Sequence, residues 1–107
     1  MTIKTWNIEK LTGYTPITTF YEDFSIADLF GVKAIRDTFK QGLKNAAFMG
    51  YKELTEFVMA LNWKIHEHYG RNDTFAELYS ELWEKASDYA NETLEGEEAH
   101  YYYRTID

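Results

Sequence analysis

The sequence predicts a mainly α-helical domain, a small bundle of three long antiparallel helices plus a short one. Apolar residues recur every three or four positions from residue 32 onward, which is the spacing of one helix face. The only proline among the 107 residues is Pro16, and glycines divide the rest into stretches of helical length. Because 45% of the residues are apolar and 18% are aromatic, the chain can bury one core. We expect one domain over residues 1–107.

The N-terminal segment, residues 1–24, shows no helical period. The letters G-Y-T-P at positions 13–16 are typical of a turn, and the flanking Thr, Ile, Trp and Phe residues favour extended structure. We expect irregular structure or short strands there. Ser25 to Asp28 has the form of a capping box, so a short helix is expected to begin at Ser25 and to stop at Gly31.

Three long helices are expected over residues 32–48, 51–69 and 75–94, with Gly70 as the cap of the second and a capping box before the third. Short turns between them make antiparallel neighbours, so the helical bundle spans residues 25–96. The tail, residues 97–107, is strand-like in composition. We expect it to pack on the bundle, either as a strand paired with the N-terminal segment or as an aromatic strap across the helices.

The acidity of the chain lies in its last third. The net charge is −7, yet residues 73–107 hold ten acids against two bases, Lys85 and Arg104, a local balance of −8. Direct binding to nucleic acid is disfavoured, because phosphate binding needs clustered Lys and Arg. A partner protein with a basic surface is the better complement.

One face of the predicted helix 75–94 carries a row of carboxylates. Its members recur at steps of three or four residues, and they are Glu77, Glu81, Glu84, Asp88, Glu92 and Glu95. Neighbours in such a row stand roughly 4.5–6 Å apart along the axis, whereas phosphates on one DNA strand are spaced by about 3.4 Å. The row can therefore mimic a nucleic-acid backbone and occupy the basic surface of a nuclease or similar protein. The alternative is an ordinary solvated face with Glu81 and Lys85 as an i,i+4 pair.

Two further features bear on partners. The helix at 32–48 has a basic side, Lys33, Arg36, Lys40 and Lys44, which can meet the acidic row within the bundle or across a homodimer. A structural or regulatory homodimer is therefore the second hypothesis. The tyrosines of the tail, Tyr101 and Tyr102 in particular, are candidate partner-binding anchors, with packing against the bundle as the alternative.

No catalytic residue, metal site or cofactor is predicted. The chain has no cysteine, and His66 and His68 are two positions apart, so on a helix they point to different sides. We expect His68 in the core or at its boundary and His66 at the surface. A third hypothesis is a Mg²⁺-dependent all-α nucleotide pyrophosphohydrolase, because Glu53-x-x-Glu56 and Glu81-x-x-Glu84 supply paired carboxylates of the kind that hard cations bind.

The sequence also bears on location. MTIKTWNIEK lacks the apolar run of a signal peptide, and no segment has 18 consecutive apolar residues. We expect a protein of the cytoplasm that neither enters nor binds a membrane.

Several segments carry a resemblance. The runs TFYEDFSIAD at 19–28, YKELTEFV at 51–58, LNWKI at 61–65, LWEKA at 82–86 and the closing TID resemble a family of small acidic proteins carried by phages and other mobile elements of gut bacteria. The resemblance implies a bacterial host cell and a role against host defence. It implies an inhibitor of the anti-CRISPR or anti-restriction type, whose partner is a CRISPR effector or another defence nuclease.

Overall fold

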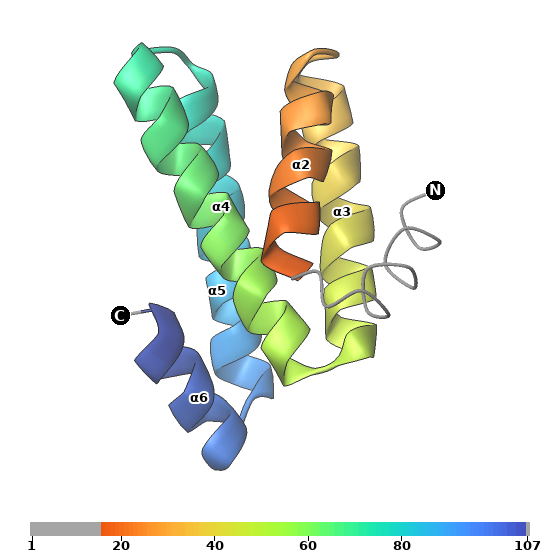
Figure 1. Ribbon diagram of the computed structural model, residues 1–107, viewed down its shortest axis with the longest axis vertical. Helices are drawn as coiled ribbons and strands as arrows, with labels where there is room; N and C mark the ends of the chain where they lie inside the picture. Colours follow the sequence, from red (N-terminus) through yellow and green to blue (C-terminus); the bar gives the residue numbers. More distant parts are fainter. Residues whose placement is uncertain (1–15, 107) are drawn as a thin grey trace.

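The computed structural model describes residues 16–106, which form five helices and, within that range, no strand (Figure 1). They are α2 (Pro16–Asp28), α3 (Val32–Met49), α4 (Tyr51–Arg71), α5 (Phe75–Thr93) and α6 (Glu97–Ile106). Figure 1 shows two helical hairpins, α2 with α3 and α4 with α5, side by side, with α6 across one end of the second. The mainly α prediction is confirmed, and the three predicted long helices are present. A longer α2 and the helix α6 join them, and no strand is found among residues 16–106.

The prediction of irregular structure or strands is wrong for residues 16–24, which belong to α2. Pro16 is the first residue of this helix, a position where its missing N–H costs nothing. Phe20, Phe24 and Ala27 are buried at helical spacing. The expected turn at 13–16 and the rest of that segment, residues 1–15, lie outside the described residues.

The predicted capping box at Ser25 is also wrong, because α2 runs through it to Asp28. Neither side chain caps a helix start. Ser25 and Asp28 instead accept hydrogen bonds from Lys64 of α4. The helix ends at Asp28, and Gly31 follows with a φ of 107°, a backbone conformation that favours glycine.

The three long helices α3, α4 and α5 lie where the apolar spacing predicts them. One end differs: α4 continues through Gly70 to Arg71, and Asn72 takes the left-handed capping conformation with a φ of 57°. Asn is the residue besides glycine that adopts this conformation most readily. No helix within residues 16–106 is long and apolar enough to cross a membrane.

The strand expected in the tail is wrong, since residues 97–106 form α6. Glu97 and Glu98 stand in its first turn and Arg104 in its last, an order that suits the helix dipole. The expected packing of the tail on the bundle is observed, because α6 contacts α4 and buries Tyr102.

The core centres on Phe57 of α4, which rings of both α2 and α3 contact. Its ring centroid lies 5.1 Å from that of Phe20, 5.8 Å from Phe24 and 5.7 Å from Phe39. Helix α3 approaches this ring closely at Gly42, where an added Cβ would stand 2.6 Å from the ring of Phe57. Glycine at position 42 therefore sets how tightly α3 packs on α4.

Candidate functional site

Five of the six predicted acidic residues form one exposed face of α5. This acidic face consists of Glu77, Glu81, Glu84, Asp88 and Glu92. The opposite side of α5 is buried against α4. Glu95 is exposed too, but it follows the end of α5 at Thr93, so it lies in the turn before α6 and does not continue the face.

The acidic face meets the basic side of α3 at one point. Arg36 donates two hydrogen bonds to Glu81, from Nη1 to Oε2 at 3.0 Å and from Nη2 to Oε1 at 3.3 Å. Lys85 approaches the same carboxylate at 3.4 Å. The hydrogen bond from Arg36 lowers the pKa of Glu81. The predicted meeting of acidic and basic sides within the bundle is thus observed at Arg36.

The other four carboxylates of the acidic face have no ion-pair partner within residues 16–106. Elsewhere on the basic side of α3, Lys33 pairs with Asp37 of its own helix at 2.9 Å. Four uncompensated carboxylates on one side of one helix repel each other weakly in water. They leave a local negative field that is available to a cation from outside the chain.

A shallow hollow of about 510 Å³ adjoins the middle of the acidic face. Glu81 and Glu84 lie at its edge together with Trp83, and Asn62 and Ile65 of α4 complete it with Ser80. Carboxylates beside an indole ring form a place that accepts a basic side chain, since the ring contacts the aliphatic part and the carboxylates pair with the charge.

The tail tyrosines differ in exposure. Tyr102 is 1% exposed, and its hydroxyl lies 2.9 Å from Ser87 Oγ, so the prediction of a partner-binding anchor at Tyr102 is corrected to a core residue. Tyr101 is half-buried, in edge contact with Tyr51 at 5.4 Å. Tyr103 is exposed and donates to Asn91. Of the three tail tyrosines, Tyr102 therefore belongs to the core, Tyr101 is partly covered, and Tyr103 is exposed.

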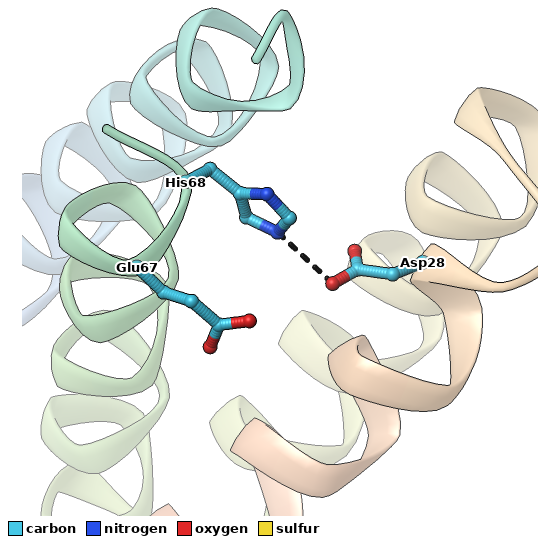
Figure 2. Close-up of side chains that lie close together, drawn as sticks. All are labelled: Asp28, Glu67 and His68. Carbon is cyan, nitrogen blue, oxygen red and sulfur yellow. Dashed lines mark hydrogen bonds and ion pairs between the residues drawn. The ribbon is translucent and has the colours of Figure 1, made fainter. Parts of the chain in front are cut away.

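A second group of charged side chains lies inside the bundle. We call it the buried polar cluster, and it consists of Asp28, Lys64, Glu67, His68 and Tyr79. Figure 2 shows Asp28 reaching from α2 toward Glu67 and His68 of α4. The cluster ties α2, α4 and α5 together through side chains rather than through apolar packing alone.

Lys64 is the cation of this cluster and is fully buried. Its ammonium donates to Asp28 Oδ2 at 2.7 Å, to Ser25 Oγ at 3.1 Å and to Glu67 Oε2 at 3.3 Å. Tyr79 donates to the other oxygen of Asp28 at 2.6 Å. A buried ammonium is stable only when its donors are satisfied in this way.

His68 is 1% exposed, and carboxylates flank both of its ring nitrogens. Nε2 lies 2.9 Å from Asp28 Oδ2 and Nδ1 lies 3.0 Å from Asp73 Oδ2. Each ring nitrogen of His68 therefore has a carboxylate oxygen at hydrogen-bonding distance. The expected positions of the histidines are confirmed, with His68 in the core and His66 exposed.

Burial and hydrogen bonds shift the pKa values of two members of the cluster, Tyr79 and Glu67, and of Asp73 beside it. Burial raises the pKa of Tyr79 strongly, and its hydrogen bond to Asp28 adds to the shift. Burial also tends to raise the pKa of Glu67, but hydrogen bonds from Tyr21 and Lys64 outweigh it and leave that pKa below its ordinary value. The hydrogen bond from His68 lowers the pKa of Asp73.

Ligand atoms of Asp28, Glu67 and His68 lie within 4.8 Å of one another, a spacing that also suits a metal ion. The ammonium of Lys64, however, already donates to the two carboxylates. A divalent cation at the same oxygens would face this fixed positive charge at contact distance, which is strongly unfavourable inside a protein. Lys64 therefore supplies the positive charge that a metal ion would otherwise provide. The role of the cluster is to hold α2, α4 and α5 together.

The carboxylate pairs of the pyrophosphohydrolase hypothesis do not converge. Within residues 16–106, Asp28, Glu67 and His68 form the one group of three or more His, Asp or Glu side chains with ligand atoms close together. Glu53 and Glu56 belong to the first turns of α4, whereas Glu81 and Glu84 lie midway along α5. Because these helices pack antiparallel, the two carboxylate pairs lie at different heights along the helix axes.

Sequence reasoning missed the buried polar cluster. Lys64 lies on the buried stripe of its helix, three residues after Leu61 and four before His68, and this position was the available signal. Searches found no family model, curated protein or solved structure that matches this chain. What the chain does must therefore be inferred from its own surfaces.

Proposed function

We propose that this chain is a non-enzymatic binding protein whose acidic face occupies a basic, nucleic-acid-binding surface of a host protein. An inhibitor of a defence nuclease, of the anti-CRISPR or anti-restriction type, is the form of this function that we favour. The observation that carries the proposal is the set of four exposed carboxylates on one face of α5 with no basic partner within residues 16–106.

The geometry supports mimicry of a phosphate row. A helix places its Cα atoms at fixed steps of about 1.5 Å per residue, so the carboxylates stand in a line whose backbone needs no further ordering on binding. A surface that evolved to neutralise phosphates presents clustered Lys and Arg. Association of such surfaces is fast and weakens as salt screens the charges.

The hollow beside Glu84 and Trp83 offers an anchoring point for the partner. An arginine or lysine of the partner can place its aliphatic part against Trp83 and its charge beside the carboxylate of Glu84. Such a contact combines apolar burial with charge pairing, the combination that makes arginine and tryptophan frequent energetic centres of interfaces.

A homodimer through the basic and acidic sides is the weaker alternative. Arg36 and Glu81, the central pair for such a dimer, already contact each other within one chain. A second copy would have to compete with that contact, and it would bring two chains of net charge −7 together.

The test compares two variants with the same change in net charge. Glu84→Lys/Asp88→Lys reverses the acidic face without touching Glu81, and Glu22→Lys/Glu98→Lys reverses two exposed carboxylates on α2 and α6. Each is used as bait in bacterial lysate, and partners identified by mass spectrometry are purified for competition with DNA. We expect the wild type and the α2/α6 variant to displace DNA from the partner, and the α5 variant to need at least about tenfold more protein. Equal displacement by both variants would overturn the proposal.

A further inference from the structure

The turn between α2 and α3 presents an unusual concentration of exposed apolar side chains. Ile26 is 58% exposed, Leu29 81%, Phe30 76% and Val32 49%. We call these four residues the apolar tip, and Figure 1 shows this turn at the free end of the α2–α3 hairpin. A cluster of this kind, within seven consecutive residues, differs from single apolar residues scattered over a surface.

Hydrogen bonds to neighbouring residues fix the conformation of the apolar tip. Asp28, directly before Leu29, contacts Lys64, His68 and Tyr79 in the buried polar cluster. Backbone hydrogen bonds from Leu29 and Phe30 to the last turn of α2, 3.0 and 2.9 Å long, close the turn. Since Asp28 is fixed inward, the next two side chains are directed outward. A fixed apolar surface loses little conformational entropy when a partner covers it.

A hollow of about 360 Å³ lies between α2 and α3 next to the tip. Its end near the turn is lined by Ile26, Ala27, Phe30 and Ala34. The rest of its lining is mostly polar and consists of Asp23, Asp37, Thr38, Gln41, Gly42 and Asn45. Leu29 does not line it. The tip therefore combines a protruding side chain with a hole, the two elements that a two-fold contact between identical surfaces requires.

The tip also lies in a part of the chain that carries little net charge. Although the net charge is −7, residues 23–37, which include the two aspartates that line the hollow, contain three carboxylates, Asp23, Asp28 and Asp37, against two cations, Lys33 and Arg36. Asp37 pairs with Lys33 at 2.9 Å. Asp28 is neutralised inside its own chain by Lys64. The acidic face belongs to another helix, so two copies that meet at their tips bring together near-neutral surfaces.

We propose that a second copy of this chain covers the apolar tip, with Leu29 of each copy seated in the α2–α3 hollow of the other. At the observed exposures, the four tip residues present roughly 500 Å² on one copy, a large patch for a monomer. Two tips together remove about 1,000 Å² from water, which reaches the lower limit of specific interfaces. The dimer is therefore weak and concentration-dependent, with a dissociation constant on the order of micromolar.

Analytical ultracentrifugation of the full chain tests this proposal. Leu29→Ser and Phe30→Ser are compared with Phe48→Ser, which removes an isolated apolar side chain, 91% exposed, near the other end of α3. We expect each tip variant to raise the dissociation constant at least about tenfold and Phe48→Ser to leave it unchanged. Circular dichroism checks that all three variants keep their helices, as substitutions at exposed sites should.

Salt separates this dimer from a charge-paired one. The tip dimer should persist or strengthen when NaCl is raised, whereas association through acidic and basic faces weakens. A dimer that dissociates when NaCl is raised would overturn the proposal. A dissociation constant that rises as much in Phe48→Ser as in the tip variants would also overturn it. A wild type that stays monomeric up to roughly millimolar concentration would overturn it too. In that case another protein would be the occupant of the tip. The acidic-face proposal is unaffected by either result, because its variants lie on α5.

A spin label gives a second, independent readout. The chain has no cysteine, so Lys33→Cys provides a single labelling site on an exposed side chain beside the tip. Labelled protein is mixed with unlabelled, ¹⁵N-enriched protein. We expect intermolecular broadening of the amide signals of Ala34 and Thr38, which line the hollow. Broadening confined to α5 or α6, or no broadening at all, would contradict the proposed contact.

Discussion

The acidic face of α5 and the buried polar cluster contain the same kinds of charged side chain in opposite settings. In the cluster, Lys64 is fully buried and every charge has a partner at hydrogen-bonding distance. On the acidic face, four carboxylates are exposed and have no ion-pair partner within residues 16–106. Burying a charge requires a partner from the same chain, whereas an exposed charge costs folding little and stays available to another molecule. The cluster should therefore control stability, and the acidic face should control binding.

The largest expected effect is that of Lys64→Met. It removes the ammonium that neutralises Asp28, and methionine of similar length cannot donate to a carboxylate. Glu67 keeps its ion pair with Arg71 at 2.7 Å, so the expected cost arises at Asp28. Leaving buried charges uncompensated costs about 3–5 kcal/mol. Urea unfolding should show this loss, while the control Lys85→Met, at an exposed position of α5, should change stability by less than about 0.5 kcal/mol. Equal effects at the two lysines would remove the distinction between the two regions.

Tyr79→Phe should have an intermediate effect. The hydroxyl of Tyr79 donates to Asp28 Oδ1 at 2.6 Å, and its loss leaves that oxygen without its closest donor while the ring stays in place. An unsatisfied buried acceptor costs about 1–3 kcal/mol. Tyr103→Phe is the matched control, since Tyr103 is exposed and its partner Asn91 can turn to water. A loss no larger than that of the control would mean that water replaces the hydroxyl at Asp28.

The contrast between these regions also explains what the sequence could and could not predict. Helices α3, α4 and α5 follow from apolar spacing, because each buries one long stripe. The acidic face follows from the same periodicity, since exposed residues repeat with the same step. The buried polar cluster does not follow, because Asp28 and Lys64 are distant in sequence and only the packing of α2 on α4 brings them together.

The two ends of the described chain were mispredicted for a related reason. Isolated propensity favours extended structure for the β-branched residues after Pro16 and for the three consecutive tyrosines of the tail. Tertiary contacts override it: Phe20 packs on Phe57, and Tyr102 is buried with its hydroxyl beside Ser87. For Tyr102 this packing also removes a predicted binding residue.

Acid should weaken the fold through Glu67 and Asp73, by less than the two substitutions above. The pKa of each lies below its ordinary value in the folded protein, so the unfolded chain takes up protons first as the pH falls. Their stabilising contribution is complete above the ordinary carboxyl pKa and is lost as the pH falls through the folded values. We expect the urea midpoint to decline below about pH 5, and to decline less steeply in Glu67→Gln than in Glu84→Gln. Parallel declines would show that Glu67 is not responsible.

The smallest expected effect on stability is that of Glu84→Lys/Asp88→Lys, the variant expected to lose partner binding. Neither residue has an ion-pair partner within residues 16–106, and replacing them removes repulsion along the acidic face. The urea midpoint should therefore stay the same or rise, with a change within about 0.5 kcal/mol. Arg36→Ala is the informative companion, because it frees the carboxylate of Glu81 at the cost of one exposed ion pair, which contributes little to stability. If the acidic face is a binding surface, this variant should bind the partner at least as well as the wild type, with a steeper dependence on salt. A double reversal that unfolds the protein would mean instead that these carboxylates serve the fold.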